Sequence, residues 1–219
     1  MGRVRVHAFS MSIDGYGAGP DQGVDNPLGI NGHRLHEWIF KTRYGRAMTG
    51  GEDGETGIDN DLFARRDEGI GATIMGRNMY GPIRGPWGDS QWTGWWGSNP
   101  PFRHPVFVLS HYPHRPVDME GGTTFHFVDD GIESALERAR AAAEGKDVLI
   151  GGGAATIRQY LEAGLIDELY LVIVPVLLGK GERLFDDLDV GFDDYECVEH
   201  LSSPAVTHIR LAKVATGSR

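Results

Sequence analysis

The chain has 219 residues and a net charge of −10, because 31 acidic side chains outnumber 21 Lys and Arg side chains. This charge disfavours a nucleic acid as a partner, since the field of the protein repels phosphates. Cys197 is the single cysteine, which excludes an internal disulfide and a cysteine-rich zinc site and predicts a reducing, cytoplasmic location. Residues 1–9 do not resemble a secretory signal, and Pro175 interrupts the longest apolar run, residues 169–178, well short of the roughly 20 apolar residues of a membrane helix. We therefore expect a soluble protein.

Glycine is unusually frequent in this chain, with 32 residues in 219. That is about twice the average usage of ~7%, so the fold should contain many tight turns or close backbone approaches. In chain order, the first part predicts a strand, a long irregular loop, a helix, a glycine-rich connection and a second helix, at residues 3–9, 15–32, 33–44, 45–57 and 60–68. Val4, Val6 and Ala8 are expected on one face of the first strand. Gly69 is expected to end the second helix.

Short apolar strands and helices alternate in the middle of the chain. The strands are predicted at residues 72–75, 106–109, 125–128 and 148–150, and the helices at residues 132–144 and 154–163. The first of these helices has one apolar stripe, and Asp130 with Glu133 has the spacing of a capping box at its start. Gly164 is expected to close the second. This alternation predicts an α/β sheet that is mostly parallel.

The last third of the chain has strand-like runs without helices between them, at residues 168–178, 195–201 and 206–214. Antiparallel pairing at one edge is the natural interpretation, which gives a mixed sheet. No repeat, linker or change of composition marks a boundary, so residues 1–219 are predicted to form a single domain. The exposed edge of the last strands predicts a homodimer.

The clearest candidate for a binding site is the segment 148–157, a buried strand that runs into Gly151, Gly152 and Gly153 and then a helix. Glycines at a helix N-terminus expose backbone N–H groups, and the helix dipole favours a phosphate there. A plain tight turn is the structural alternative. The spacing also differs from the G-x-G-x-x-G of common dinucleotide-binding folds.

Two further strand ends carry polar residues. Gly76 and Arg77 follow one strand, and Ser110 and His111 follow another. Because the carboxyl ends of strands in an open sheet meet in one crevice, Arg77 there could bind an anion through two hydrogen bonds. A lone surface arginine and an ordinary Ser-His turn are the alternatives.

Asp14 follows the first strand and is the obvious carboxylate near its end. It is a candidate proton donor, although Asp before Gly is equally a turn former. Trp87, Trp92, Trp95 and Trp96 lie in a Gly/Pro-rich loop, where they could wall a planar ligand or pack the loop onto the body of the protein.

The sequence predicts no metal site and no nucleophilic catalysis. His33 and His36 have i,i+3 spacing without further placeable ligands, and structural or solvated roles are favoured for the histidines. No G-x-S-x-G elbow occurs, and Cys197 lies in an edge-strand pattern.

At these junctions the sequence resembles the dihydrofolate reductase-like superfamily, and more closely the branch related to the C-terminal reductase domain of the bacterial riboflavin-biosynthesis deaminase/reductase. The motifs that carry the resemblance are Ser-Ile-Asp-Gly at 12–15, Met-Gly-Arg-Asn-Met at 75–79, Val-Leu-Ser-His at 108–111, Ile-Gly-Gly-Gly at 150–153, and the two stretches 164–171 and 174–185. Each motif is short, but their order and spacing along nearly the whole chain make the set fairly specific.

The resemblance implies a single α/β domain that binds NADPH in an extended pose across the carboxyl edge of the sheet. It implies that Gly76, Arg77, Ser110 and His111 lie near the adenosine phosphate. The pyrophosphate is implied near the glycines 151–153 and Thr156, and the nicotinamide near Ser10. Charge-assisted hydrogen bonds from Arg77 to the extra phosphate would then favour NADPH over NADH.

The sequence departs from the pattern of the dihydrofolate reductases at three positions. Ala154 stands where an arginine is frequent, Met79 replaces a hydroxyl residue at a helix start, and Val172 replaces a threonine on a strand. The missing threonine assists a folate-binding carboxylate in those enzymes. These differences disfavour dihydrofolate as the substrate.

The resulting hypothesis is an NADPH-dependent reductase that acts on a pterin- or pyrimidine-type heterocycle or on its ribosylamine derivative. The protein would orient the two rings in a dry cleft while the cofactor supplies the hydride. Two alternatives stay open: a non-catalytic nucleotide-binding or dimeric interaction protein on the same fold, and a reductase that uses a flavin or deazaflavin.

Overall fold

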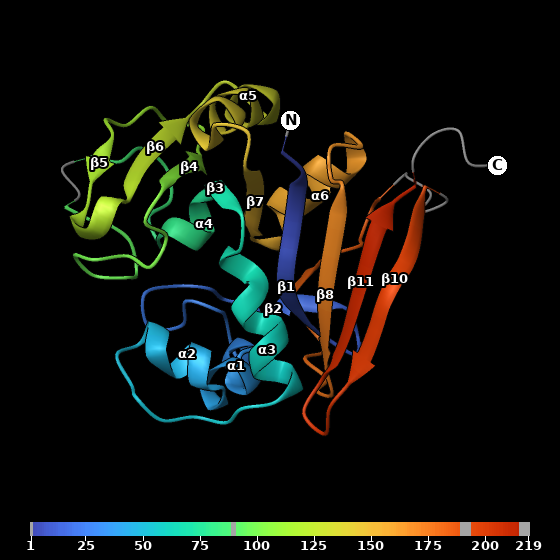
Figure 1. Ribbon diagram of the computed structural model, residues 1–219. Coiled ribbons are helices and arrows are strands. Elements are labelled where there is room, and N and C mark those ends of the chain that lie inside the picture. The colour runs from blue at the N-terminus through green and yellow to red at the C-terminus, as the bar shows by residue number, and fades with distance from the viewer. Residues whose placement is uncertain (1, 89–90, 189–193, 215–219) are drawn as a thin grey trace.

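The computed structural model describes residues 2–88, 91–188 and 194–214. A nine-stranded sheet crosses this part of the chain (Figure 1). Its strands are β1 (Val4–Ser12), β3 (Ile70–Gly76), β4 (Pro105–Leu109), β5 (Val117–Asp118), β6 (Thr124–Val128), β7 (Asp147–Gly152), β8 (Glu168–Val174), β10 (Tyr195–Ser202) and β11 (Thr207–Lys213). Their order across the sheet is β10-β11-β8-β1-β7-β3-β4-β6-β5.

The sheet is mixed. The run from β8 through β1, β7, β3 and β4 to β6 is parallel. Strands β10 and β11 are antiparallel additions at one edge and β5 at the other. The predicted α/β fold class, a mostly parallel dihydrofolate reductase-like sheet with antiparallel C-terminal strands, is confirmed.

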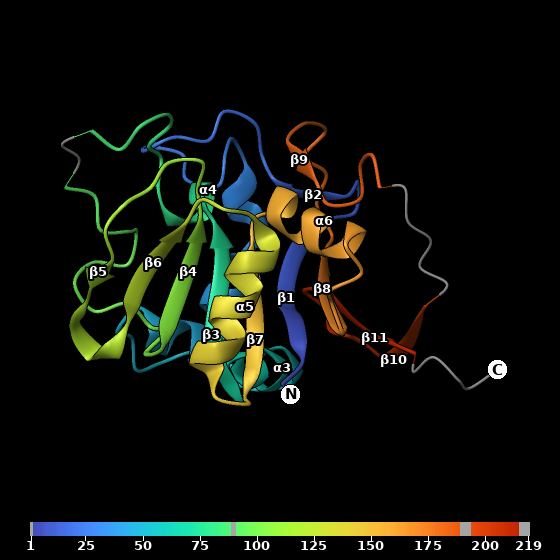
Figure 2. The same cartoon turned by 90° about the horizontal axis from the view of Figure 1, so that it is seen from above.

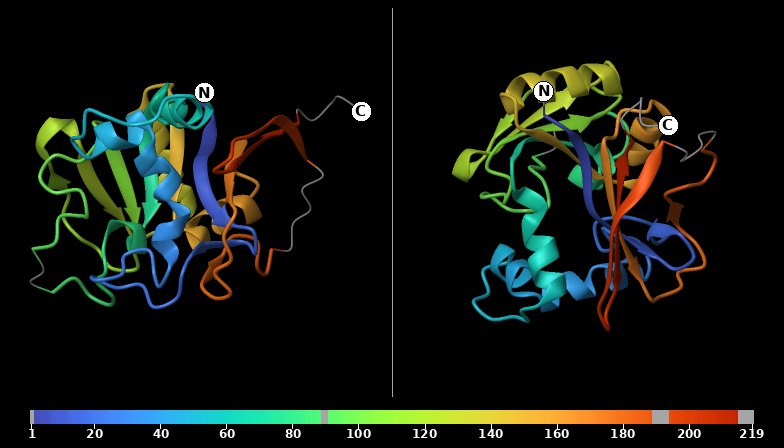
Figure 3. Two further views of the ribbon diagram at one scale, coloured as in Figure 1. Left: turned by 90° about the horizontal axis from the view of Figure 1, so that it is seen from below. Right: turned by 45° about the vertical axis from the view of Figure 1, so that its right-hand side comes forward.

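Helices cover both faces of the sheet. Helices α5 (Ile132–Ala143) and α6 (Ala154–Glu162) pack on one face (Figure 2), and α1 (Glu37–Lys41), α2 (Arg43–Met48) and α3 (Ile58–Ala64) lie on the other (Figure 3). The predicted apolar stripe of α5 is confirmed, because Ala135, Leu136 and Ala139 are buried against strands β3, β4 and β7. Burial of such stripes from both sides contributes the main stabilisation of the layers.

Strand β1 changes its inward face partway along its length. Val4 and Val6 join the core under α5 and α6, but Ala8 packs in the core under α1 and α3. The register slips between Val6 and Phe9, and Ala8 has a φ of 51°, as expected of a β-bulge. The prediction that Ala8 shares a face with the two valines was therefore wrong. The bulge turns Ser10 towards the face that carries α1.

The predicted helix over 33–44 is interrupted. A 3₁₀ turn (Gly32–Leu35) precedes α1, and Thr42 separates α1 from α2 with an extended ψ of 152°. The Thr42 hydroxyl accepts a hydrogen bond from the Gly45 N–H, so this residue ends one helix and caps the next. The helix predicted over 60–68 begins earlier, and its last turn is a 3₁₀ turn, Arg65–Asp67.

Two other local predictions differ from the structure. The N-cap of helix α5 is Gly131, which has no side chain to cap the helix. The Asp130 carboxylate instead accepts a hydrogen bond from Arg138 at 2.7 Å. The capping box was therefore wrong. Four short helices and strands were not predicted: α4 (Arg77–Tyr80), the edge strand β5, and the two-stranded sheet of β2 (Tyr16–Ala18) and β9 (Glu182–Arg183). In the described ranges no helix has the length and apolar character that crossing a membrane requires.

Candidate functional site

Strands β7, β3 and β4 are parallel neighbours, so the three junctions singled out in the sequence lie side by side at their carboxyl ends. A cavity of about 410 Å³ opens there. Six of the ten predicted site residues line it: Gly76, Arg77, Ser110, His111, Gly153 and Thr156. Its size is within the range of small-molecule and cofactor sites.

The first wall of the cavity is made where β3 meets α6. The Thr156 hydroxyl packs so closely on Gly76 that a Cβ at position 76 would lie 2.3 Å from Thr156 Oγ1. Any residue could adopt the φ of −76° at position 76. Glycine is required there because a larger side chain would collide with Thr156. This contact brings the N-terminus of α6 against the junction that carries Arg77.

The second wall is an arginine held between aromatic rings. The Arg77 guanidinium carbon lies 3.8 Å from the centre of the Trp87 ring and 5.3 Å from that of Tyr112. The Arg77 Nε and Nη2 atoms are buried and have no hydrogen-bond partner. Burial, and then the nearby positive charge of Arg84, lowers the pKa of Arg77 from its ordinary value. The unpaired edge of Arg77, with the positive charge of Arg84 beside it, favours an anion in this cavity.

The third wall is the turn after β4. The Ser110 hydroxyl donates to the Tyr112 carbonyl at 2.9 Å and accepts from the Tyr112 N–H at 3.1 Å. Ser110 N–H donates to the carbonyl of Val128, which ties this turn to β6. Ser110 thus shapes the turn that carries Tyr112, while His111 beside it is exposed and lines the cavity.

The glycine run at the end of β7 is divided between packing and the cavity. Gly152 has a φ of 122°, a conformation that favours glycine, and Gly153 is the N-cap of α6. Gly151 and Gly152 do not line the cavity. They lie under the side chains of Met79 and Phe9 instead. Only the last glycine of the run therefore faces the cavity.

Asp14 lies apart from this cavity. Its carboxylate accepts hydrogen bonds from the N–H groups of Leu178 at 3.1 Å and Gly179 at 2.7 Å, and so ties the loop after β1 to the loop after β8. Burial alone would raise the pKa of Asp14, but hydrogen bonds from Ser12, Gly179 and Leu178 outweigh it and lower the pKa. A carboxyl group held in its ionised form is poorly suited to donate a proton, so the geometry favours the turn-forming alternative.

Ser10 is buried on the sheet face that carries α1, where its hydroxyl accepts a hydrogen bond from Trp38 Nε1 at 3.0 Å. It does not line the cavity. Of the tryptophans of the Gly/Pro-rich loop, Trp87, Trp92 and Trp96 pack around Tyr80 and Phe125. The structure favours the packing alternative for this loop.

Several residues that line the cavity were not predicted: Arg84, Tyr112, Asp129, Gln159 and Glu182. Tyr112 lies directly after the Ser-His pair, so its proximity could have been inferred from the sequence. The others come from loops, from α6 and, for Glu182, from β9, and nothing in a single sequence indicates that they approach the cavity.

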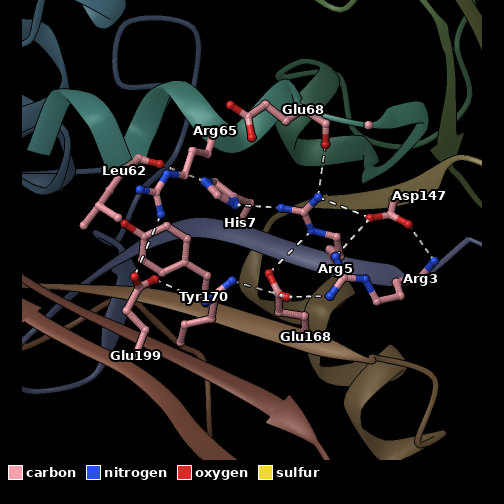
Figure 4. Close-up of a pocket in the computed structure, with 12 residues that line it drawn as sticks. Arg3, Arg5, His7, Leu62, Arg65, Glu68, Asp147, Glu168, Tyr170 and Glu199 are labelled. Atoms are coloured by element: carbon pink, nitrogen blue, oxygen red, sulfur yellow. Dashed lines mark hydrogen bonds and ion pairs between the residues drawn. The ribbon is translucent and has the colours of Figure 1, made fainter. Parts of the chain in front are cut away.

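A second cavity, of about 390 Å³, lies at the amino ends of strands β1, β7 and β8 (Figure 4). Arg5 contacts Asp147 at 3.2 Å and Glu168 at 3.5 Å, and Arg3 contacts Glu168 at 3.1 Å. The positive and negative side chains there pair with one another. His7 in the same cavity stays neutral, because burial and then the charge of Arg5 lower its pKa to about 3. The charges of this network compensate one another, although Arg5 Nε and Arg210 Nε have no hydrogen-bond partner among the described residues. This compensation favours the carboxyl-end cavity as the site of a charged ligand.

The family model for the RibD C-terminal domain matches residues 5–215. The chain therefore belongs to the RibD C-terminal domain family. Its similarity to the uncharacterized protein YyaP of Bacillus subtilis (strain 168) is 39% identity over 62 residues, 28% of this chain and 32% of that protein. The chain thus matches only about a third of that relative.

Solved structures share the fold. A putative riboflavin biosynthesis protein from Shewanella sp. PV-4 has a TM-score of 0.61 at 21% identity, over 98% of this chain and 100% of that one. The diaminohydroxyphosphoribosylaminopyrimidine deaminase/5-amino-6-(5-phosphoribosylamino)uracil reductase of Thermotoga maritima has a TM-score of 0.54 at 13% identity, over 97% of this chain and 56% of that one. These similarities confirm the fold, and the family match over residues 5–215 confirms the predicted branch.

Proposed function

We propose that the chain is an NADPH-dependent oxidoreductase that reduces a pyrimidine- or pterin-type heterocycle or its ribosylamine derivative. The observation that carries this proposal is the cavity where Arg77 presents an unpaired guanidinium beside the N-terminus of α6. Family membership supports the pyrimidine-reductase-like class, since a protein of the same fold from Thermotoga maritima is described as a uracil-derivative reductase.

The residues of the cavity fit the phosphates of such a cofactor. Arg77 and Arg84 supply positive charge, and Gly153 with Thr156 begins a helix whose dipole favours an anion. Glu182 also lines the cavity and opposes an anion near it. Bound there, NADPH would supply a hydride to the substrate. The protein itself would contribute binding, orientation and exclusion of water.

Titration of the purified protein with NADPH and with NADH, followed by calorimetry, tests the cofactor. We expect Arg77→Gln to weaken NADPH binding by about 10- to 100-fold, since a hydrogen bond to a charged group contributes roughly 1.5–3 kcal/mol. NADH binding should change little. Arg46→Gln on α2, which removes an equal charge on the face of the sheet opposite α6, where Arg46 pairs with exposed Asp53, is the matched control. Absence of saturable NADPH binding at millimolar concentration would refute the proposal.

A non-catalytic nucleotide-binding protein is the second candidate, because the backbone N–H groups of Leu178 and Gly179 already occupy the Asp14 carboxylate. Consumption of NADPH, measured by its absorbance against a panel of aminopyrimidines and pteridines, separates the two. Binding without consumption of any panel member supports the second candidate. A yellow purified protein would instead support the flavin alternative.

We also propose that the chain forms a homodimer through β10. This strand is at the edge of the sheet, and Val198 and Leu201 on it are 45% and 36% exposed. An exposed edge strand of eight residues offers backbone groups for pairing with a second copy. Light scattering should show a dimer for the native chain and a 24 kDa species for Val198→Glu. A native chain of 24 kDa at micromolar concentration contradicts this proposal.

A further inference from the structure

Among the described residues, the Arg77 guanidinium has a face contact but no hydrogen-bond partner. Its carbon lies 3.8 Å from the centre of the Trp87 ring, and Nε and Nη2 are buried without a partner. Stacking on a ring uses the face of a guanidinium and leaves its N–H groups free in the plane. The side chain is therefore oriented, yet its donors stay available for an anion.

The Trp87 ring and the backbone of Tyr112, which flank Arg77, are themselves held by hydrogen bonds. Trp87 Nε1 donates to the Tyr112 carbonyl at 3.0 Å, and the Ser110 hydroxyl bonds both the N–H and the carbonyl of Tyr112. The Trp87 ring also contacts the rings of Phe127 and His114, each 5.0 Å away between ring centres, and that of Tyr80 at 6.0 Å. Trp87 is 9% exposed, whereas Tyr112 is 37% exposed and closes the outer side of the bracket.

We propose that Trp87 and Tyr112 are positioning residues that hold Arg77 in its cavity-facing orientation and thereby set the preference of the chain for NADPH over NADH. The inference rests on the proposed cofactor. A free arginine side chain loses rotamer entropy when it is fixed, and this cost falls on the ligand unless the protein has already ordered the group. Because NADH lacks the extra phosphate, only NADPH gains from an ordered Arg77.

A positioning role and a purely structural role predict different effects on the affinities for NADPH and NADH. Loss of a packing residue lowers the affinity for both dinucleotides together through a less ordered cavity. Loss of a positioning residue lowers the affinity for NADPH alone. The ratio of the two dissociation constants is therefore the informative quantity.

The test compares Trp87→Leu, Trp87→Phe and Tyr112→Leu with the native chain by calorimetric titration of both dinucleotides. We expect Trp87→Leu and Tyr112→Leu each to weaken NADPH binding by about tenfold and NADH binding by less than twofold. Trp87→Phe, which keeps a ring but loses the indole donor, should give an intermediate loss. Trp95→Leu is the matched control, since Trp95 contacts Trp92 rather than Arg77.

Two further measurements make the outcome decisive. In an Arg77→Gln background, Trp87→Leu should cause no additional loss of discrimination, because the group that it positions is absent. In the free protein, NMR should show ring-current-shifted Arg77 side-chain resonances that return to ordinary positions in Trp87→Leu. Tyr112→Leu, at an exposed position, remains informative if the Trp87 variants do not fold.

Equal losses for both dinucleotides, or an unchanged ratio in a chain that prefers NADPH, would overturn the positioning role while the proposed cofactor stands. A native chain that binds neither dinucleotide removes the proposed function and the discrimination together. That result is distinct, because the NMR shift would then still report whether the bracket orders Arg77.

Discussion

Gly76→Ala tests whether the close contact between β3 and α6 shapes the cavity. The backbone at position 76 is open to any residue, so alanine would gain about 0.4–1 kcal/mol through the unfolded chain if nothing opposed it. The added Cβ, however, would lie 2.3 Å from Thr156 Oγ1. Overpacking of this kind costs about 1–3 kcal/mol. We expect a net loss of about 1–2 kcal/mol, which lowers the melting temperature of a chain of this length by roughly 2–8 °C.

Thr156→Ala provides the decisive comparison, because it removes Oγ1 and leaves Thr156 Cβ 3.6 Å from the new methyl group, an ordinary contact. In that background Gly76→Ala should be neutral or stabilising by up to about 1 kcal/mol. Urea unfolding of the four variants gives the coupling free energy, expected at about 1–3 kcal/mol. Gly23→Ala, where a Cβ meets no atom within 4 Å, is the control. Equal effects of Gly76→Ala in both backgrounds would refute the reasoning.

Three other predictions concern the charged groups around the sheet. Asp59→Asn should lower the free energy of unfolding by about 1–3 kcal/mol, because buried His208 loses the carboxylate that it contacts at 2.8 Å. Thermal unfolding measures this loss, with Asp61→Asn at an exposed position as the control, and equal effects of the two substitutions would contradict it. The free energy of unfolding of the native chain should fall as the pH falls below about 6.5, because His7 becomes protonated in the unfolded chain but not in the folded chain, where its pKa is about 3. In His7→Asn this pH dependence, measured by urea unfolding, should be weaker by up to about 1.4 kcal/mol per pH unit. Asp14→Asn should destabilise the chain by about 1 kcal/mol, since an amide group would face backbone donors; a lost turnover rate at unchanged stability would instead support its role as the acid.

Much of the sheet could be predicted because local patterns determine it. The apolar runs of β3, β4, β6 and β7 and the stripe of α5 indicate their own structures. Parallel neighbours end at the same edge, so the strand-end positions of Gly76, Ser110 and Gly153 already imply that they lie together. Their roles as cofactor ligands stay a prediction.

The errors arise where a contact distant in sequence overrides the local pattern. The bulge at Ala8 is set by pairing of β1 with β8, which begins about 160 residues later. The break at Thr42 coincides with a bridge from Thr42 to Glu55, across a loop whose composition predicts no structure. The Trp87–Arg77–Tyr112 bracket likewise joins three segments whose approach no periodicity reveals.

The arginines at the two ends of the parallel strands differ in their partners, and this difference supports different roles for the two cavities. At the amino edge Arg5 is 8% exposed and is paired with Asp147 and Glu168, so its charge is compensated within the protein (Figure 4). At the carboxyl ends of the strands, the described neighbours of Arg77 include two ring faces and a second arginine, while Asp129 and Glu182 line the same cavity. An unpaired buried guanidinium lowers stability, and an anion that binds there recovers that free energy as affinity. Arginine charge is therefore compensated at the amino ends of the strands, and the capacity to bind an anion is left where the carboxyl ends of the strands meet the N-terminus of α6.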